Sequence, residues 1–242
     1  MGNYQPRSKL ADATHDNNLT APALVTPDGP LTRWRQAHPN GDPVAWQEEQ
    51  APNKNLLRRF RGGPFQVDQF ADSAAYDLKS RIYRCEYEGF AAVVYRVKMH
   101  LGSDIAGGPN GGIPFMVFSI DTPRPVPRTA IRPAGTFDAL QRGRGYQGIK
   151  TDDKEFDQHY HLQGEDERFA LALLTPAFKQ FLGANQLTQV LSFVFDGTTL
   201  STWNRATVLG QGGSPYLLDY MSMMVDYLVQ VIRATPPELW QS

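Results

Sequence analysis

The sequence predicts an α+β fold: an antiparallel sheet of about six or seven strands packed by C-terminal helices, with an extended N-terminal arm. Two observations predict it. Strand patterns with a period of two come first in the chain, helical patterns come mostly later, and short turns rather than crossover helices join the strands. In addition, the beginning of the 242-residue chain contains few β-branched side chains. We therefore divide the chain into an arm, residues 1–65, and an α+β domain, residues 66–242.

The arm is rich in Pro, Asn, Asp and Gln, so it cannot bury much apolar surface by itself. It contains one helix signal at residues 42–50, where Asp42 would cap the helix and Pro43 would occupy its first turn. Trp34 and Trp46 stand out in this polar context. Large aromatic side chains in such a segment favour docking, and we expect both tryptophans to bind the protein's own body or a partner chain.

The strand-rich part of the chain begins with a hairpin. Apolar and polar residues alternate over 83–88 and again over 90–101, and Glu88-Gly89 supplies a short turn between the two runs. A third strand is expected over residues 115–120. Beyond it, prolines at every second position predict an extended, rigid linker over residues 122–128.

The middle of the domain has clear element boundaries. Alternating apolar residues predict a strand over 155–162. A helix is expected to begin near Asp166. Thr175 is placed to cap a second, short helix that covers residues 176–182 and is closed by Gly183.

The last part of the chain is predicted as a hairpin followed by a helix. Asp196-Gly197 is a strong two-residue turn signal between apolar runs at 189–195 and 198–203. The final helix begins at Ser214-Pro215 and ends at Thr235-Pro236-Pro237. Its apolar residues cover more than one face, so we expect it to be sandwiched, with the arm or a partner covering what the sheet leaves exposed.

The back half of the sequence resembles an uncharacterised actinobacterial family, also carried by actinobacteriophages, over roughly residues 58–240. The residues that carry the resemblance are Glu155-Phe156, Asp166-Glu167-Arg168-Phe169-Ala170, Leu174-Thr175-Pro176, Leu200, Trp203 and Pro237-Glu238-Leu239-Trp240. The resemblance implies the same α+β fold. Members of that family often carry membrane or envelope anchors, whereas this sequence has no comparable apolar stretch. The family has no assigned activity, so no catalytic residue is carried over.

The sharpest chemical candidate is a pair of histidines. On the predicted strand His159 and His161 point the same way and Asp157 joins them, so two imidazoles and a carboxylate could face a metal ion. The simpler interpretation is a solvated strand face opposite the buried side chains. Two or three ligands on one strand do not by themselves form a closed tetrahedral site.

Other motifs favour structural roles. Residues 143–148 match the glycine pattern of a dinucleotide site but lack the strand before and the helix after that this site requires. The acidic residues at 165–167 are typical of the first turn of a helix. Cys85 lies on the apolar side of its strand and is expected to be an inert core thiol.

A basic run lies near the end of the arm, where Arg58, Arg59 and Arg61 follow Lys54. Such a run could contact phosphate groups of nucleic acid or of an anionic lipid, but four charges are few, and a solvated linker is the favoured explanation. The formal net charge of −1 argues against nucleic acid as a general partner. Peripheral contact with an anionic membrane surface stays open.

The composition excludes several classes of protein. A single cysteine rules out an internal disulfide framework and a four-cysteine zinc site. The polar start of the sequence is no signal peptide, and no apolar run reaches the length of a membrane span, so a cytoplasmic location is expected.

No nucleophile, acid–base and oxyanion constellation can be assembled from these residues. We therefore predict a non-enzymatic interaction or assembly protein, with no cofactor. Its arm is expected to dock on its own body or on a partner chain. The partner chain would be a second copy of this protein or a different protein. The alternative is a metal-dependent or small-molecule enzyme that uses the face formed by His159 and His161.

Overall fold

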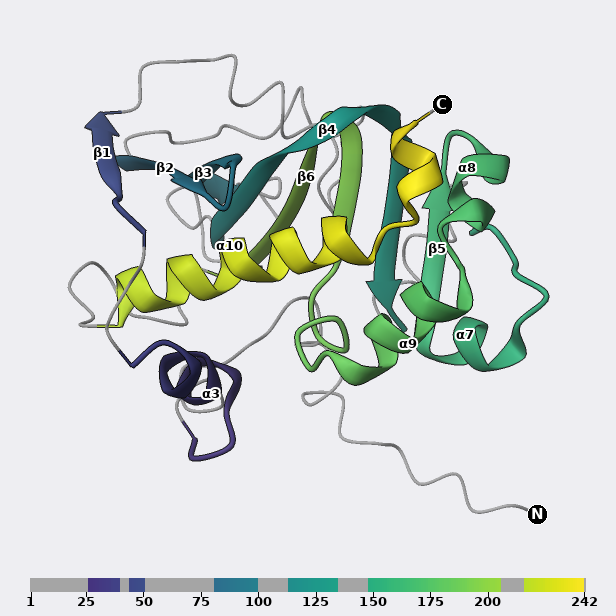
Figure 1. Cartoon of the computed structure of the whole chain (residues 1–242), viewed down its shortest axis with the longest axis horizontal. Helices are drawn as coiled ribbons and strands as arrows, with labels where there is room; N and C mark the ends of the chain where they lie inside the picture. Colours follow the sequence, from purple (N-terminus) through teal and green to yellow (C-terminus); the bar gives the residue numbers. More distant parts are fainter. Residues whose placement is uncertain are drawn as a thin grey trace.

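The computed structural model describes residues 26–39, 44–50, 81–99, 113–134, 148–205 and 216–241. In this part of the chain six strands form one antiparallel sheet, and the long C-terminal helix lies across one of its faces (Figure 1). The predicted α+β class, with an antiparallel sheet packed by C-terminal helices, is thereby confirmed. The strands are β1 (Gln47–Gln50), β2 (Arg81–Tyr87), β3 (Phe90–Met99), β4 (Ile113–Pro133), β5 (Tyr160–Gly164) and β6 (Phe193–Arg205). The helices are α3 (Pro30–Ala37), α7 (Lys154–His159), α8 (Glu167–Ala172), α9 (Pro176–Ala184), α10 (Leu217–Ala234) and the 3-10 helix η3 (Pro237–Trp240).

The hairpin formed by β2 and β3 has the predicted turn. Glu88 and Gly89 both adopt positive φ, 51° and 83°, as a two-residue turn that matches the strand twist requires. Tyr83 pairs with Val94, and Val94 in turn pairs with Phe118 of β4, so the first four strands are neighbours in chain order.

Strand β4 continues through the proline segment that the sequence analysis assigned to a linker, so the linker prediction is wrong. The backbone is extended there as predicted, but it remains part of the sheet. Pairing with β6 jumps from Asp121 opposite Thr199 to Val126 opposite Gly197. Proline has no N–H to donate to a neighbouring strand, and the segment therefore bulges where its prolines lie.

Strand β6 also differs from the prediction, because Asp196-Gly197 does not form a hairpin turn. The run predicted over 198–203 and the end of the run predicted over 189–195 belong to one strand, Phe193–Arg205, while residues 189–192 precede it. Gly197 has a φ of 60°, but it uses this conformation at the irregularity opposite Val126. Both long strands are thus irregular at the same place. The first part of β4 pairs with β3 and the last part pairs with β5.

The strand predicted over residues 155–162 is wrong in its first half. Residues 154–159 form the short helix α7, and the strand β5 begins only at Tyr160. The cause is an N-cap: the Asp153 carboxylate accepts hydrogen bonds from the backbone N–H groups of Glu155 and Phe156, each at 3.1 Å. The helices predicted at Asp166 and after Thr175 are both present, with these two side chains as N-caps.

The N-terminal arm contains a helix, but not at residues 42–50. Gln47–Gln50 form β1, which pairs with β2, while positions 40–43 lie outside the described residues. The helix is α3, which begins at Pro30 and buries Leu31 and Trp34 on one side.

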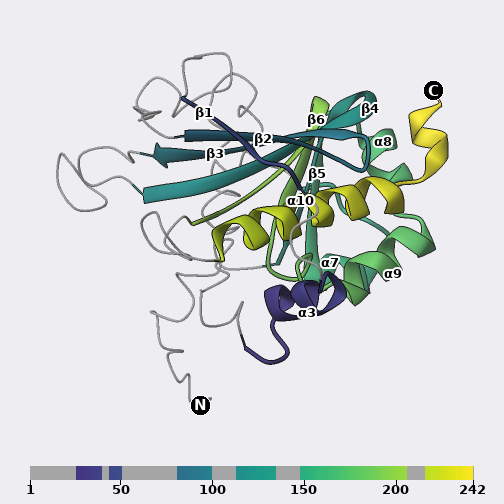
Figure 2. The same ribbon diagram turned by 60° about the vertical axis from the view of Figure 1, so that its left-hand side comes forward.

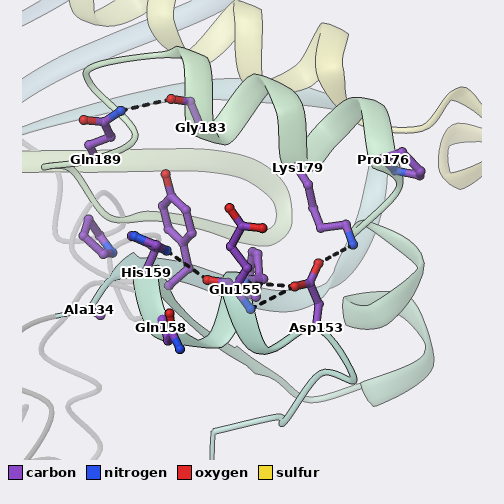
Figure 3. Close-up of a pocket in the computed structure, with 12 residues that line it drawn as sticks. Ala134, Asp153, Glu155, Gln158, His159, Pro176, Lys179, Gly183 and Gln189 are labelled. Atoms are coloured by element: carbon purple, nitrogen blue, oxygen red, sulfur yellow. Dashed lines mark hydrogen bonds and ion pairs between the residues drawn. The ribbon is translucent and has the colours of Figure 1, made fainter.

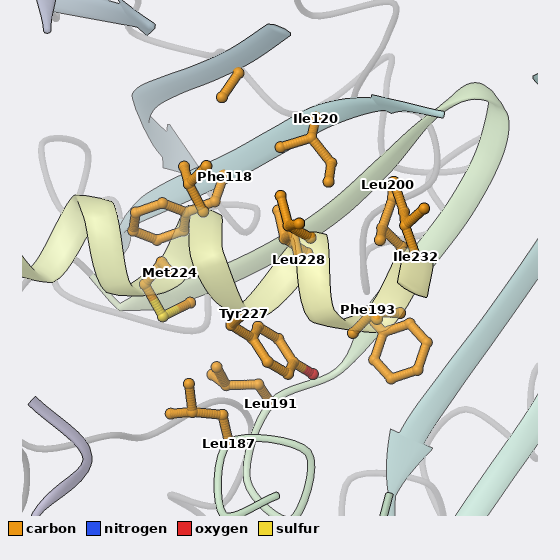
Figure 4. Close-up of a cluster of buried hydrophobic side chains, with 14 of the residues drawn as sticks. Phe118, Ile120, Leu187, Leu191, Phe193, Leu200, Met224, Tyr227, Leu228 and Ile232 are labelled. Atoms are coloured by element: carbon orange, nitrogen blue, oxygen red, sulfur yellow. The ribbon is translucent and has the colours of Figure 1, made fainter. Parts of the chain in front are cut away.

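Helix α10 is buried on nearly all sides. The sheet face contributes Phe118, Ile120 and Leu200, while Leu187 and Leu191 pack on the opposite side of the helix (Figure 4). Helix α3 also lies against α10 (Figure 2). The helix therefore lies between the sheet on one side and α3 with the segment that carries Leu187 and Leu191 on the other, as the sequence predicted. None of the described helices is long and apolar enough to cross a membrane.

Two tyrosines of α10 offer a matched test of this core. The Tyr227 hydroxyl is fully buried and has no hydrogen-bond partner among the described residues, whereas the Tyr220 hydroxyl accepts a hydrogen bond from the Asn204 amide at 3.0 Å. We expect Tyr227→Phe to raise the free energy of unfolding by about 1 kcal/mol, because it removes an unsatisfied polar group. We expect Tyr220→Phe to lower it by about 1–3 kcal/mol, because it takes an acceptor from a buried amide. Urea denaturation measures both, and equal effects would contradict this account of the core.

Candidate functional site

A groove of about 720 Å³ lies between α7 and α9, at the end of β4 (Figure 3). One wall is α7, the other is a face of α9, and the loop after α9 contributes Gln189. Its volume is in the range of small-molecule sites. The residues that line it are Pro133, Ala134, Asp153, Glu155, Phe156, Gln158, His159, Tyr160, Pro176, Lys179, Gly183 and Gln189.

An ion pair links the two helices at one end of the groove. The Lys179 ammonium donates to the Asp153 carboxylate at 2.6 Å. The same carboxylate caps α7, so it holds the helix start and α9 together. The hydrogen bond from Lys179 is the main reason why the pKa of Asp153 lies below its usual value. Both groups of the pair are thus engaged within the fold.

Two other side chains of α7 are exposed in the groove. The Glu155 carboxylate projects into the space between α7 and α9 (Figure 3). One turn later, Nδ1 of His159 lies 2.9 Å from the backbone carbonyl of Glu155. A carbonyl oxygen only accepts, so in the neutral ring Nδ1 carries the hydrogen and Nε2 is the acceptor.

The structure does not bring the three predicted metal ligands onto one strand face. Asp157 and His159 lie on α7, whereas His161 lies on β5 opposite Arg132. The Asp157 carboxylate accepts hydrogen bonds from the Thr151 hydroxyl and N–H, at 2.8 and 3.3 Å, and so holds the turn before the helix. The described residues contain no cluster of three or more His, Cys, Asp or Glu side chains that could hold a metal ion.

Both tryptophans of the arm lie against the body of the protein. Trp34 is 7% exposed and belongs to the hydrophobic core. Trp46 is partly buried, and its indole N–H donates to the Ser222 hydroxyl of α10 at 3.0 Å. At the edge of this contact, Arg35 forms an ion pair of 2.9 Å with Asp219 and lies over the Tyr216 ring.

The other predicted residues are located as follows. Arg58, Arg59 and Arg61 lie outside the described residues, and so do positions 143–147 of the glycine motif. Cys85 is buried on β2.

A line of polar residues runs along α10, and the sequence analysis missed it. Its members recur at intervals of three or four, the spacing of one helix face: Asp219, Ser222, Asp226, Gln230 and Arg233. We call this line the polar seam. Each member has a partner outside the helix, in the same order: Arg35, Trp46, Tyr87, Asn185 and Glu88. Polar residues at helical spacing in an otherwise apolar helix were a usable signal in the sequence.

The centre of the polar seam is Asp226. Its carboxylate accepts hydrogen bonds from the Tyr87 hydroxyl at 3.1 Å and from the Gln230 amide at 2.7 Å. Burial raises the pKa of Asp226, while these hydrogen bonds and the nearby His38 oppose the rise and Glu88 adds to it. Burial therefore makes the ionised form of the Asp226 carboxyl less favourable than it is in water.

Comparisons with known proteins give little. No family model matches the chain, and no curated protein matches it. Among solved structures, the chain is similar to the crystal structure of the mycobacterial trehalose monomycolate transport factor A, TtfA, with a TM-score of 0.43 and 9% sequence identity. The similarity covers 85% of this chain and 94% of that one. A TM-score this low does not assign the fold of that protein to the present chain.

The separation of the histidines leads to a prediction about metal content. We expect protein purified without a histidine tag to hold no stoichiometric zinc, iron or nickel, because His159 and His161 do not share a face with Asp157. Elemental analysis measures this. One equivalent of metal that is lost in the His159→Ala/His161→Ala double variant would contradict it.

The pKa of Asp226 leads to a second prediction. A carboxyl group with a raised pKa in the folded state stabilises the protein at low pH, and this contribution is lost as the pH rises through the folded-state pKa. We therefore expect Asp226→Asn to gain stability relative to wild type as the pH rises from about 4 to about 7. Denaturation at several pH values measures the difference. The exposed Glu238→Gln variant is the control, and a difference that shrinks with rising pH would refute the prediction.

Proposed function

We propose that this protein is a non-enzymatic interaction or assembly protein whose N-terminal arm docks on its own body. The observation that carries the proposal is the contact of the arm with α10, through α3, Trp34 and Trp46. The arm covers a face of α10 that the sheet does not reach (Figure 2).

The contact has the anatomy of a protein–protein interface. A buried aromatic centre, Trp34, is bordered by a solvated polar rim, where the Arg35 side chain is 52% exposed in its pair with Asp219. Tryptophan and arginine are the residue types that dominate binding at such interfaces. The contact is also remote in sequence, since Trp46 and Ser222 are 176 positions apart. These features support an arm that recognises a surface.

The same surface offers a route to a partner. A partner chain, or a second copy of this chain, could supply the apolar side chains that the arm supplies here, and the arm would then cover α10 until assembly. We also propose a cytoplasmic location and membership of the actinobacterial family that the sequence resembles. Contact of Arg58, Arg59 and Arg61 with an anionic membrane surface is a further proposal. Nucleic acid is not proposed as a partner.

The enzyme alternative relied on a strand face shared by two histidines, and the structure does not contain that face. It required His159 and His161 side by side on one strand, and a helix boundary now separates them. In addition, Asp153 and Asp157 support α7 through hydrogen bonds rather than facing a free reactive group.

Removal of the arm tests the proposal. Deletion of residues 1–65 also removes the edge strand β1. We expect it to leave strands β2 to β6 and α10 folded but to expose the outer face of α10, which causes self-association or the loss of a partner. In the full chain, Trp34→Ala should lower the free energy of unfolding by about 3–5 kcal/mol, because a buried tryptophan is removed. Light scattering and thermal melting measure these effects.

The exposed Leu171→Ala variant on α8 is the control and should behave as wild type. A truncated protein that stays monodisperse, melts at the wild-type temperature and keeps every partner would make the arm a passive tail and end the proposal.

A further inference from the structure

We propose that the groove between α7 and α9 binds a cationic donor group, an ammonium or a guanidinium, carried by a basic side chain of a peptide or by a small polyamine. This deepens the proposed interaction function by naming the chemistry of a ligand. The groove is formed by α7 and α9, away from the residues that hold the arm on α10.

The charged groups of the groove favour a cationic ligand that donates hydrogen bonds. Its one lysine, Lys179, already donates to Asp153 at 2.6 Å. The Glu155 carboxylate has no side-chain partner among the described residues, and Nε2 of His159 is left as an acceptor. A ligand that carries hydrogen-bond donors is therefore complementary to these two acceptors, while the cation of the groove is already engaged.

The two acceptors lie together on one wall. Glu155 and His159 are four positions apart on α7, so they are neighbours on one helix face. Figure 3 shows the Glu155 carboxylate directed toward α9, across the open part of the groove. A cation placed there would contact the Glu155 carboxylate through charge-assisted hydrogen bonds.

The rest of the lining suits the apolar stem of a basic side chain. The rings of Phe156 and Tyr160 stack with centroids 5.4 Å apart at the base of α7, and Pro133 and Pro176 also line the groove. Lysine and arginine side chains bury their methylene groups along such surfaces and keep the charged end in a polar environment. The charged end of a basic side chain would therefore contact Glu155, and its methylene groups would lie along the apolar part of the lining.

Charge disfavours an anionic ligand. The lining contains the carboxylates of Asp153 and Glu155 against the ammonium of Lys179. An anion would have to compete with Asp153 for Lys179, and Asp153 is held in place because its other carboxylate oxygen caps α7.

Binding of model compounds to the full chain tests the proposal. The probes are Nα-acetyl-arginine amide, spermidine, the uncharged isostere Nα-acetyl-citrulline amide and inorganic phosphate, titrated at millimolar concentrations and followed by NMR. We expect saturable binding of the arginine compound, of spermidine, or of both, with affinity at least fivefold higher than for the citrulline compound. Tighter binding of the arginine compound indicates a peptide side chain as the source of the cation, and tighter binding of spermidine indicates a polyamine.

Two variants locate the binding. Glu155→Gln should weaken binding of the cationic probes at least fivefold, because the group keeps its size and loses its charge. Glu167→Gln, an exposed carboxylate in the first turn of α8, should leave binding unchanged. Circular dichroism confirms that both variants are folded.

The proposal is overturned if neither cation binds saturably, if Glu155→Gln binds them as tightly as wild type, or if phosphate or the citrulline compound binds as well as the cations. These results would leave the arm experiments untouched, since those depend on Trp34, Trp46 and light scattering. A passive arm would likewise leave the titrations unaffected.

Discussion

Helix α10 is apolar around most of its circumference, with the polar seam as the exception, so cover on both of its sides contributes to its stability in water. Residues as far apart around the helix as Tyr220, Met221, Met223 and Val225 are all buried. Each large apolar side chain contributes about 1.5–3 kcal/mol when it is removed from water. One sheet face cannot supply all of that cover. The outer side needs α3 with Trp34, together with the segment that carries Leu187 and Leu191.

Elements with local signals could be predicted from the sequence. The hairpin of β2 and β3 has its turn residues, α8 and α9 have their N-caps, and α10 has its apolar pattern. The errors fall where a local signal had two possible uses. Gly197 could make a turn or a bulge, and only pairing with the bulged β4 decides between them. Asp153 could precede a strand or cap a helix, and its contact with Lys179, 26 positions away, favours the helix.

The candidate site was predictable only in part for the same reason. Trp34 and Trp46 were identified because large aromatic residues are rare in a polar arm, and both lie against the body. His159 was singled out for a strand face that does not exist, yet it lines the groove. Glu155 and Lys179 could not have been assigned to one groove from the sequence, because nothing local in it places α7 beside α9. A groove between two helices is a property of the tertiary fold.

The polar seam explains how an apolar helix can have one orientation. A helix that is apolar on every side could rotate about its axis with little loss of buried area, so burial alone does not select one rotation. A polar line that meets partners from α3, from β2 and from the residue after α9 does select one. Rotation would separate Asp226 from Tyr87 and Gln230 from Asn185, whereas the hydrogen bond between Asp226 and Gln230 lies within the helix and would not hold its orientation. This arrangement has an energetic cost, because burial disfavours the ionised form of Asp226 and so raises its pKa. Since two members of the seam, Asp219 and Ser222, are satisfied by the arm, the orientation of α10 and the docking of the arm depend on each other.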